Sequence, residues 1–141
     1  MTKIFLAASM NFYPKLLQIE AELLSRGFEI EIPVSAKMMR ERNDFVVEHF
    51  KDSHSNAQKA DFFRENINNM EECDSILVIN EEKNGISGYI GTSVIMEIGI
   101  AWYLHKKIYV WNELPPDAAY KPEIDAFGAQ VINRDLSNVK G

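Results

Sequence analysis

Short apolar runs separated by helical patterns constrain the fold of this chain most strongly. Residues 3–8, KIFLAA, form an apolar run without polar alternation, as expected for a central parallel strand that is buried on both faces. A strongly apolar run at residues 76–80 and another at residues 108–111 predict two further strands. Because buried parallel strands need helices to cover both faces of their sheet, these runs indicate an α/β fold.

Between these runs, apolar residues recur at helical spacing. Tyr13–Arg26 and Asn56–Glu72 each show this pattern, the second with one apolar stripe. Residues 92–104 are apolar on nearly every side and begin with Thr92 and Ser93, two residue types that cap helices. The sequence therefore predicts three helices, the third of them deeply packed.

Weaker patterns complete the alternation of strands and helices. Residues 28–32 alternate apolar and acidic side chains and end at a proline, which suits a short strand near the sheet edge. A short helix around residues 121–127 precedes a fifth strand at residues 129–132. Right-handed crossovers then give a doubly wound, three-layer α/β/α fold with a five-stranded parallel sheet of order 2-1-3-4-5. We expect residues 1–141 to form a single domain.

Residues 36–56 have no readable period. The segment is charged, rich in Met and Arg near its start, and contains His49 and His54. We expect it to be either a mobile lid or a helical excursion from the main fold.

Composition and charge argue against several kinds of partner. The net charge of −6, without a run of Lys or Arg, argues against nucleic-acid binding. No segment approaches the roughly 18 apolar residues needed to cross a bilayer. The lone Cys73 and the spacing of His49, His54 and His105 fit no metal site, and the turn AASMNFYP lacks a phosphate cradle for FMN. We therefore expect a cytoplasmic protein with a small-molecule ligand and no cofactor or metal.

In such sheets the ligand lies beyond the carboxyl ends of the strands, at the switch point between the first and third. Ser9 and Asn11 follow the first strand, Asn80 ends the third, and Asn112 follows the fourth. These four residues are candidates for substrate binding, although Ser and Asn are also ordinary capping residues in turns.

Residues 84–92 place three glycines before the start of a helix. Gly88, Tyr89, Gly91 and Thr92 could present backbone amides or a ring to an anionic or polyhydroxylated ligand. The spacing is neither that of a P-loop nor that of a dinucleotide fingerprint. Ordinary turn formation is the alternative, and Tyr89 could stack on a base or anchor the loop to the core.

Glu97 is the only charged residue between Val94 and Leu104. An unpaired carboxylate in apolar surroundings is costly and acquires a raised pKa. Glu97 therefore either serves a ligand site as a nucleophile or base, or pairs with an Arg or Lys at the rim of the protein.

The segments KIFLAAS, CDSILVIN and, above all, GYIGTSVIMEIGIAWYLHKKIYVWNELP resemble the nucleoside 2-deoxyribosyltransferase-like superfamily, in particular its short branch. The resemblance covers most of the chain outside residues 34–56, and its most specific part is the pattern Glu97, Gly99, Ala101. It implies that Glu97 is a nucleophile that attacks the anomeric carbon of a nucleoside. The resulting glycosyl ester is then released to a second base or to water.

The resemblance also implies a residue that handles the base or its proton. Active members carry an aspartate on the helix before the third strand, and the matching position here is Asn66. Because a neutral amide cannot donate a proton as an acid, Glu65 or Asp61 could substitute if they face the site. Two functions stay open: deoxyribosyl transfer or hydrolysis on nucleosides or nucleotides, and a non-catalytic nucleotide-binding or interaction module.

Aromatic residues suggest self-association. Trp102, Tyr103 and Trp111 supply more apolar surface than one small domain needs. Members of the family that resemble this chain form homo-oligomers with shared sites. We therefore expect at least a homodimer.

Overall fold

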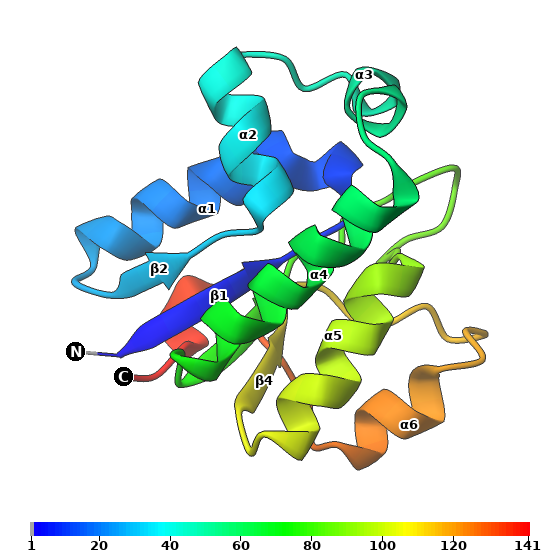
Figure 1. Cartoon of the computed structure of the whole chain (residues 1–141). Coiled ribbons are helices and arrows are strands. Elements are labelled where there is room, and N and C mark those ends of the chain that lie inside the picture. Colours follow the sequence, from blue (N-terminus) through cyan, green and yellow to red (C-terminus); the bar gives the residue numbers. More distant parts are fainter. Residues whose placement is uncertain (1) are drawn as a thin grey trace.

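The computed structural model describes residues 2–141, and its centre is a five-stranded parallel sheet (Figure 1). The strand order is β2-β1-β3-β4-β5, and every neighbouring pair is parallel. The strands are β1 (Lys3–Ala7), β2 (Glu29–Glu31), β3 (Ser75–Val78), β4 (Lys107–Val110) and β5 (Gln130–Val131). This order confirms the predicted doubly wound sheet.

Helices cover both faces of the sheet, which gives the three predicted layers (Figure 1). They are α1 (Tyr13–Ser25), α2 (Val34–Arg42), α3 (Val47–Asp52), α4 (Asn56–Glu71), α5 (Thr92–Tyr103) and α6 (Lys121–Ala126), with short 3-10 turns at Met10–Phe12 and Leu136–Asn138. Two clusters of buried hydrophobic residues lie on the two faces of the sheet. Buried side chains of α1, α2 and α3 belong to one cluster, and those of α4, α5 and α6 belong to the other.

The two faces of β1 explain why its sequence shows no polar alternation. Ile4 and Leu6 pack into the cluster beneath α1, whereas Phe5 and Ala7 pack into the cluster beneath α4 and α5. Since both faces are covered, every position from Ile4 to Ala7 must be apolar.

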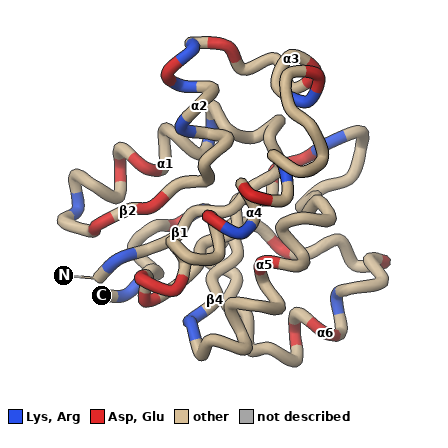
Figure 2. The backbone as a smooth tube through the Cα atoms, in the orientation of Figure 1, with Lys and Arg blue, Asp and Glu red and all other residues tan. Residues whose placement is uncertain are grey.

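Residues 36–56 form a helical excursion, one of the two predicted alternatives. Helices α2 and α3 lie outside the sheet at the top of the view in Figure 1, and Figure 2 shows charges of both signs along them. Each is short, and α2 buries only Ser35, Ala36 and Met39. Two short helices with so few buried positions leave no legible apolar period.

The start and the packing of α5 differ from the prediction. Gly91 is the N-cap, and no side chain caps this helix, so Thr92 and Ser93 do not act as the expected caps. One side of the helix packs on the sheet through Val94, Ile98 and Ala101, and the other is exposed. The prediction of a deeply packed helix therefore holds for one side only, because Met96, Trp102 and Tyr103 on the outer side stay at least half exposed.

Within the part of the chain that the structure describes, none of the helices combines the length and apolar character needed to span a membrane.

Candidate active site

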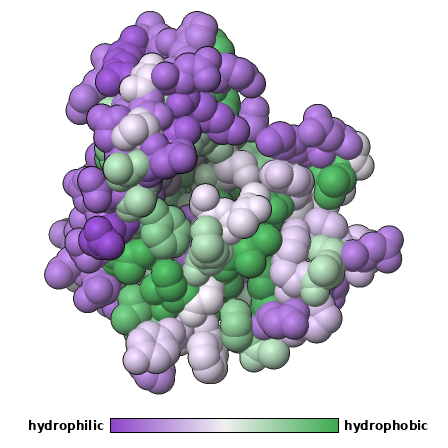
Figure 3. All heavy atoms as spheres, turned by 45° about the vertical axis from the view of Figure 1, so that its right-hand side comes forward, coloured by the Kyte–Doolittle hydropathy of each residue, from purple (hydrophilic) through white to green (hydrophobic). Residues whose placement is uncertain are grey.

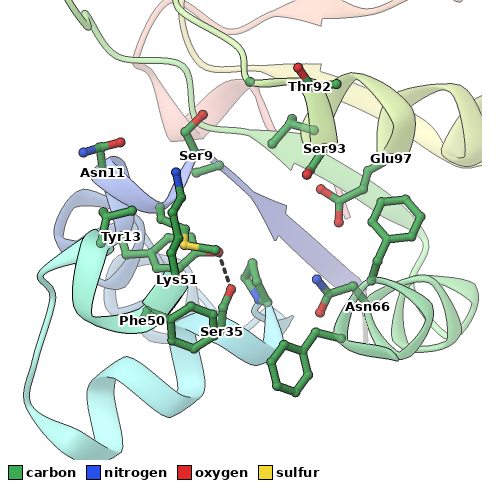
Figure 4. Close-up of a pocket in the computed structure, with 18 of the residues that line it drawn as sticks. Ser9, Asn11, Tyr13, Ser35, Phe50, Lys51, Asn66, Thr92, Ser93 and Glu97 are labelled. Atoms are coloured by element: carbon green, nitrogen blue, oxygen red, sulfur yellow. Dashed lines mark hydrogen bonds between the residues drawn. The ribbon is translucent and has the colours of Figure 1, made fainter. Parts of the chain in front are cut away.

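A cavity of about 380 Å³ opens at the carboxyl edge of the sheet, beyond the end of β1 (Figure 4). Its walls come from the turn after β1, from α1, α2, α3 and α4, and from the first two turns of α5. The order of strands reverses between β1 and β3, so the cavity lies at the predicted switch point.

Glu97 lies on the second turn of α5, with 4 % of its surface exposed, and lines the cavity. Figure 4 shows its carboxylate directed into the open space. Among residues 2–141 it forms neither an ion pair nor a side-chain hydrogen bond. Burial without a counter-charge raises the pKa of Glu97 to about 8.

Tyr13 and Ser35 form a buried polar pair in the wall of the same cavity. The Tyr13 hydroxyl and the Ser35 hydroxyl are 2.6 Å apart, and the bond joins α1 to α2. Burial raises the pKa of Tyr13, the bond to Ser35 opposes this shift, and the charge of Glu97 adds to it. Tyr13 is therefore a neutral hydroxyl close enough to Glu97 to sense its charge.

Asn66, on α4, also lines the cavity. Its Oδ1 accepts a hydrogen bond of 2.9 Å from the backbone N–H of Val34. Because the oxygen is held in this way, the amide nitrogen is the group left for the cavity, as Figure 4 shows. This position offers a hydrogen-bond donor and no acid.

Asp61 and Glu65 do not substitute for an acid at position 66. Both are exposed and neither lines the cavity. Asp61 lies five residues before Asn66, and Glu65 lies one residue before it. On a helix these spacings place them about 140° and about 100° away from Asn66 around the axis. The geometry of α4 therefore turns both carboxylates away, and Asp61 instead lies 3.7 Å from Arg64.

Ser9, Asn11, Gly91 and Thr92 all line the cavity. Gly91 allows a close approach there, because a Cβ at this position would lie 2.6 Å from the Ser9 hydroxyl oxygen. The lack of a side chain lets the start of α5 sit against the turn after β1.

Tyr89 lines the cavity and also anchors its loop. Its ring packs edge-on against Phe12, with 6.4 Å between centroids, and Lys83 Nζ lies 4.9 Å from its centroid. Both roles predicted for Tyr89 are thus compatible with its position.

Asn80, Gly88 and Asn112 lie outside the cavity wall, where they hold loops together. The Asn80 amide donates to the carbonyls of Asn112 (2.9 Å) and Gly88 (3.3 Å), and Asn80 Oδ1 accepts from the Asn112 N–H at 2.8 Å. Gly88 has φ +73°, and a Cβ there would collide with the Glu113 carbonyl. Their polar groups are used within the protein, so the geometry does not favour the substrate contacts expected for them.

Several cavity residues could not be found from the sequence. They comprise aromatic and cationic side chains on α3, α4 and the loop after β3: Phe50, Lys51, Lys59, Phe62, Phe63 and Lys83. Only the apolar spacing of Phe63 on α4 gave any signal, and it indicated a core position. Three of the six, Lys51, Lys59 and Lys83, are cations, whereas Glu97 is the one acidic residue of the wall within the described chain.

No group of three or more His, Cys, Asp or Glu side chains within residues 2–141 is arranged to hold a metal ion.

Comparison with solved structures first defines the class of fold. The CMP N-glycosidase BcmB of Clostridium botulinum superimposes with a TM-score of 0.57 at 16 % identity, covering 96 % of this chain and 92 % of that one. A 2-deoxyribosyltransferase of Bacillus psychrosaccharolyticus gives a TM-score of 0.61 at 18 % identity, with coverages of 99 % and 93 %. Both share the fold of this chain.

Sequence comparison then gives the family. The family model for nucleoside 2-deoxyribosyltransferase matches residues 4–133, nearly the whole chain. No curated protein sequence matches. The chain belongs to the nucleoside 2-deoxyribosyltransferase family, as its sequence motifs predict.

Proposed function

We propose that this protein is an enzyme that acts on the N-glycosidic bond of nucleosides or nucleotides, with Glu97 as its nucleophile. The observation that carries this proposal is the buried carboxylate of Glu97, which faces the cavity without an internal cation. An uncompensated buried charge is costly and is retained where a ligand or a reaction uses it.

The proposed reaction has two steps. A carboxylate oxygen of Glu97 attacks the anomeric carbon of the sugar while the bond from that carbon to the base nitrogen breaks, and the base takes the electron pair. The glycosyl ester is then attacked at the same carbon by water or by a second base, which releases the carboxylate, and the proton that this nucleophile loses goes to the released base. A carboxylate beside an oxocarbenium-like transition state supports this double displacement, as in retaining glycosidases.

We propose that the side-chain amide of Asn66 binds the leaving base. Since Val34 fixes Oδ1, the nitrogen can donate a hydrogen bond to an acceptor atom of the base. Such a bond stabilises charge that develops on the base as the glycosidic bond breaks.

Family membership supports cleavage of an N-glycosidic bond, and either water or a second base can be the acceptor of the sugar. The two similar structures are named as an N-glycosidase and a deoxyribosyltransferase, which correspond to release of the sugar to water and to a second base. We propose that the chain works as one such domain. Its cytoplasmic location stays a prediction.

Incubation with a panel of nucleosides and their 5′-monophosphates, with and without free bases, tests the proposal. Release or exchange of a base should occur with the wild type and fall at least about a thousandfold in Glu97→Gln. Glu123→Gln makes the same change at an exposed position of α6, outside the cavity, and should retain full activity. Turnover that survives in Glu97→Gln would exclude Glu97 as the nucleophile.

A non-catalytic nucleotide-binding module is the second candidate. The neutral amide at position 66, where the family resemblance implies an aspartate, favours it. Ligand binding by the wild type without release of any base in the panel would support this function over the enzyme.

We also propose that the chain self-associates through the outer face of α5. Met96, Trp102 and Tyr103 are 50 %, 51 % and 75 % exposed, and Trp102 stacks on Phe127 of α6. Figure 3 shows apolar atoms gathered below the hydrophilic α2–α3 region. Trp111, by contrast, is buried in the core and does not contribute.

Light scattering tests this assembly. The wild type should have at least twice the mass of the chain, and Trp102→Lys combined with Tyr103→Lys should shift it to the monomer. A wild type that is monomeric at micromolar concentration would rule out the homodimer.

A further inference from the structure

The charge of the cavity wall differs from that of the whole protein. The chain has a net charge of −6, yet three lysines and a single carboxylate line this cavity. Lys51, Lys59 and Lys83 come from α3, α4 and the loop after β3, and none forms an ion pair with another of residues 2–141. Lys83 Nζ lies over the Tyr89 ring, but none of the three cations is neutralised by a described acidic side chain, and this favours an anionic ligand.

The start of α5 is a second feature of the cavity that favours an anion. This helix has 12 residues, and no side chain caps it, so its first N–H groups are free of protein side-chain acceptors. Thr92 and Ser93 line the cavity there, and the Ser9 hydroxyl lies against Gly91. Free amides at a helix N-terminus, together with hydroxyl groups, form a site suited to phosphate.

The distance from this site to the proposed nucleophile fits one sugar. Ser93 and Glu97 are four residues apart on one helix, which is about 6 Å along its axis. This separation is comparable to the span of a pentose from its anomeric carbon to a 5′-substituent. In Figure 4, Ser93 and Glu97 face the same side of α5, and the Lys51 side chain extends toward Ser9.

We infer that the site selects nucleoside 5′-monophosphates over nucleosides, with the phosphate held by the start of α5, Ser9 and Lys51 while the anomeric carbon meets Glu97. This inference rests on the proposed function. A phosphate monoester carries nearly two negative charges at pH 7, which the lysines of the wall balance. The buried carboxylate of Glu97, which has no partner among residues 2–141, also indicates that a ligand completes the cavity.

Calorimetric titration of Glu97→Gln tests the inference without turnover. The probes are the natural nucleosides and their 5′-monophosphates, ribo and deoxy, at low and high KCl. The best-bound monophosphate should bind at least about tenfold more tightly than its nucleoside, a difference of about 1.4 kcal/mol. High salt should reduce this preference because it screens exposed charges.

A second substitution identifies the cation. Lys51→Gln, added to Glu97→Gln, should lower the affinity for the monophosphate several-fold and leave that for the nucleoside unchanged. Lys121→Gln on α6 removes the same charge from a half-buried position outside the cavity, where the lysine pairs with Asp125, and should alter neither affinity. A thermal melt of each variant verifies that it is folded.

The outcomes separate the two proposals. Equal affinity for nucleoside and monophosphate, or equal turnover of both by the wild type, would overturn the phosphate preference and leave the proposed enzyme intact. Preferential binding of the monophosphate without any turnover would support the phosphate site and overturn the enzyme. An absence of both binding and turnover would overturn both.

Discussion

Glu97 on α5 and Asn66 on α4 point into one cavity, but only Asn66 is anchored within the protein. Its Oδ1 accepts the Val34 N–H at 2.9 Å, whereas the Glu97 carboxylate has no side-chain partner among residues 2–141. Helix α4 thus supplies a hydrogen-bond donor in a fixed position, and α5 supplies a carboxyl group without a counter-charge.

Glu97 should make the protein less stable as pH rises. Its pKa is raised from an ordinary value of 4.5 to about 8, so between these values the folded state holds a proton that the unfolded state has lost. The free energy of unfolding should therefore fall by up to about 1.4 kcal/mol per pH unit across this range. Urea unfolding at pH 5 and pH 8.5 measures the change.

Glu97→Gln is the control for this stability effect. The glutamine does not titrate, so the wild type should lose stability relative to the variant as pH increases. A constant difference between the two proteins from pH 5 to pH 8.5 would show that the carboxylate is not desolvated.

Activity should increase over the range in which stability declines. A nucleophilic carboxylate must be ionised, so kcat/KM should rise with pH and level off above a free-enzyme pKa near 8. A pH profile of kcat/KM measures this pKa. An acidic limb near pH 4.5 would contradict the raised pKa of Glu97 in the free enzyme.

Asn66→Asp should introduce the missing acid. One oxygen of the new carboxyl group can still accept the Val34 N–H, and the other then faces the cavity. General acid catalysis typically contributes a hundredfold or more. Cleavage of a natural nucleobase should therefore rise at least about tenfold relative to cleavage of an activated, good leaving group.

Asn66→Ala removes both groups of this side chain at once. The loss of the partner of the Val34 N–H should cost about 1–3 kcal/mol of stability. The loss of the amide donor should lower cleavage of the natural nucleobase relative to cleavage of the activated leaving group. If neither Asn66→Ala nor Asn66→Asp changes this ratio, Asn66 does not contact the leaving base.

Gly88→Ala should destabilise the protein more than Gly85→Ala. Both glycines have φ near +75°, at +73° and +78°, so the backbone strain is similar. A Cβ at Gly88 would strike the Glu113 carbonyl, whereas one at Gly85 meets nothing within 4 Å. We expect losses of about 1 kcal/mol for Gly85→Ala and more than about 2 kcal/mol for Gly88→Ala in urea unfolding. Equal losses would show that Gly88 is not a packing constraint.

The architecture could be predicted because its signals are local. The apolar runs of β1, β3 and β4 and the helical spacing of α1 and α4 fix the order of elements, and crossover handedness then fixes the sheet. Glu97 could be found because a single charge in an apolar helix is conspicuous in a sequence.

The rest of the site depends on side-chain directions, which strand ends alone do not reveal. Asn80 and Asn112 follow neighbouring strands as predicted, yet the side-chain amide of each bonds to the backbone of the other. Phe50 and Lys51 reach the cavity from α3, whose sequence has no clear period. Position 66 was identified through resemblance, but only the Val34 contact shows which end of its amide is free.

A covalent adduct on Glu97 tests the central claim most directly. A 2-fluorinated sugar analogue slows breakdown of a glycosyl ester, so mass spectrometry of the intact chain and its peptides can detect the intermediate. We predict one added fluorosugar on the peptide that contains Glu97 in the wild type, and none in Glu97→Gln. Turnover of the natural substrate without an adduct on that peptide, or with an adduct on another residue, would contradict the mechanism.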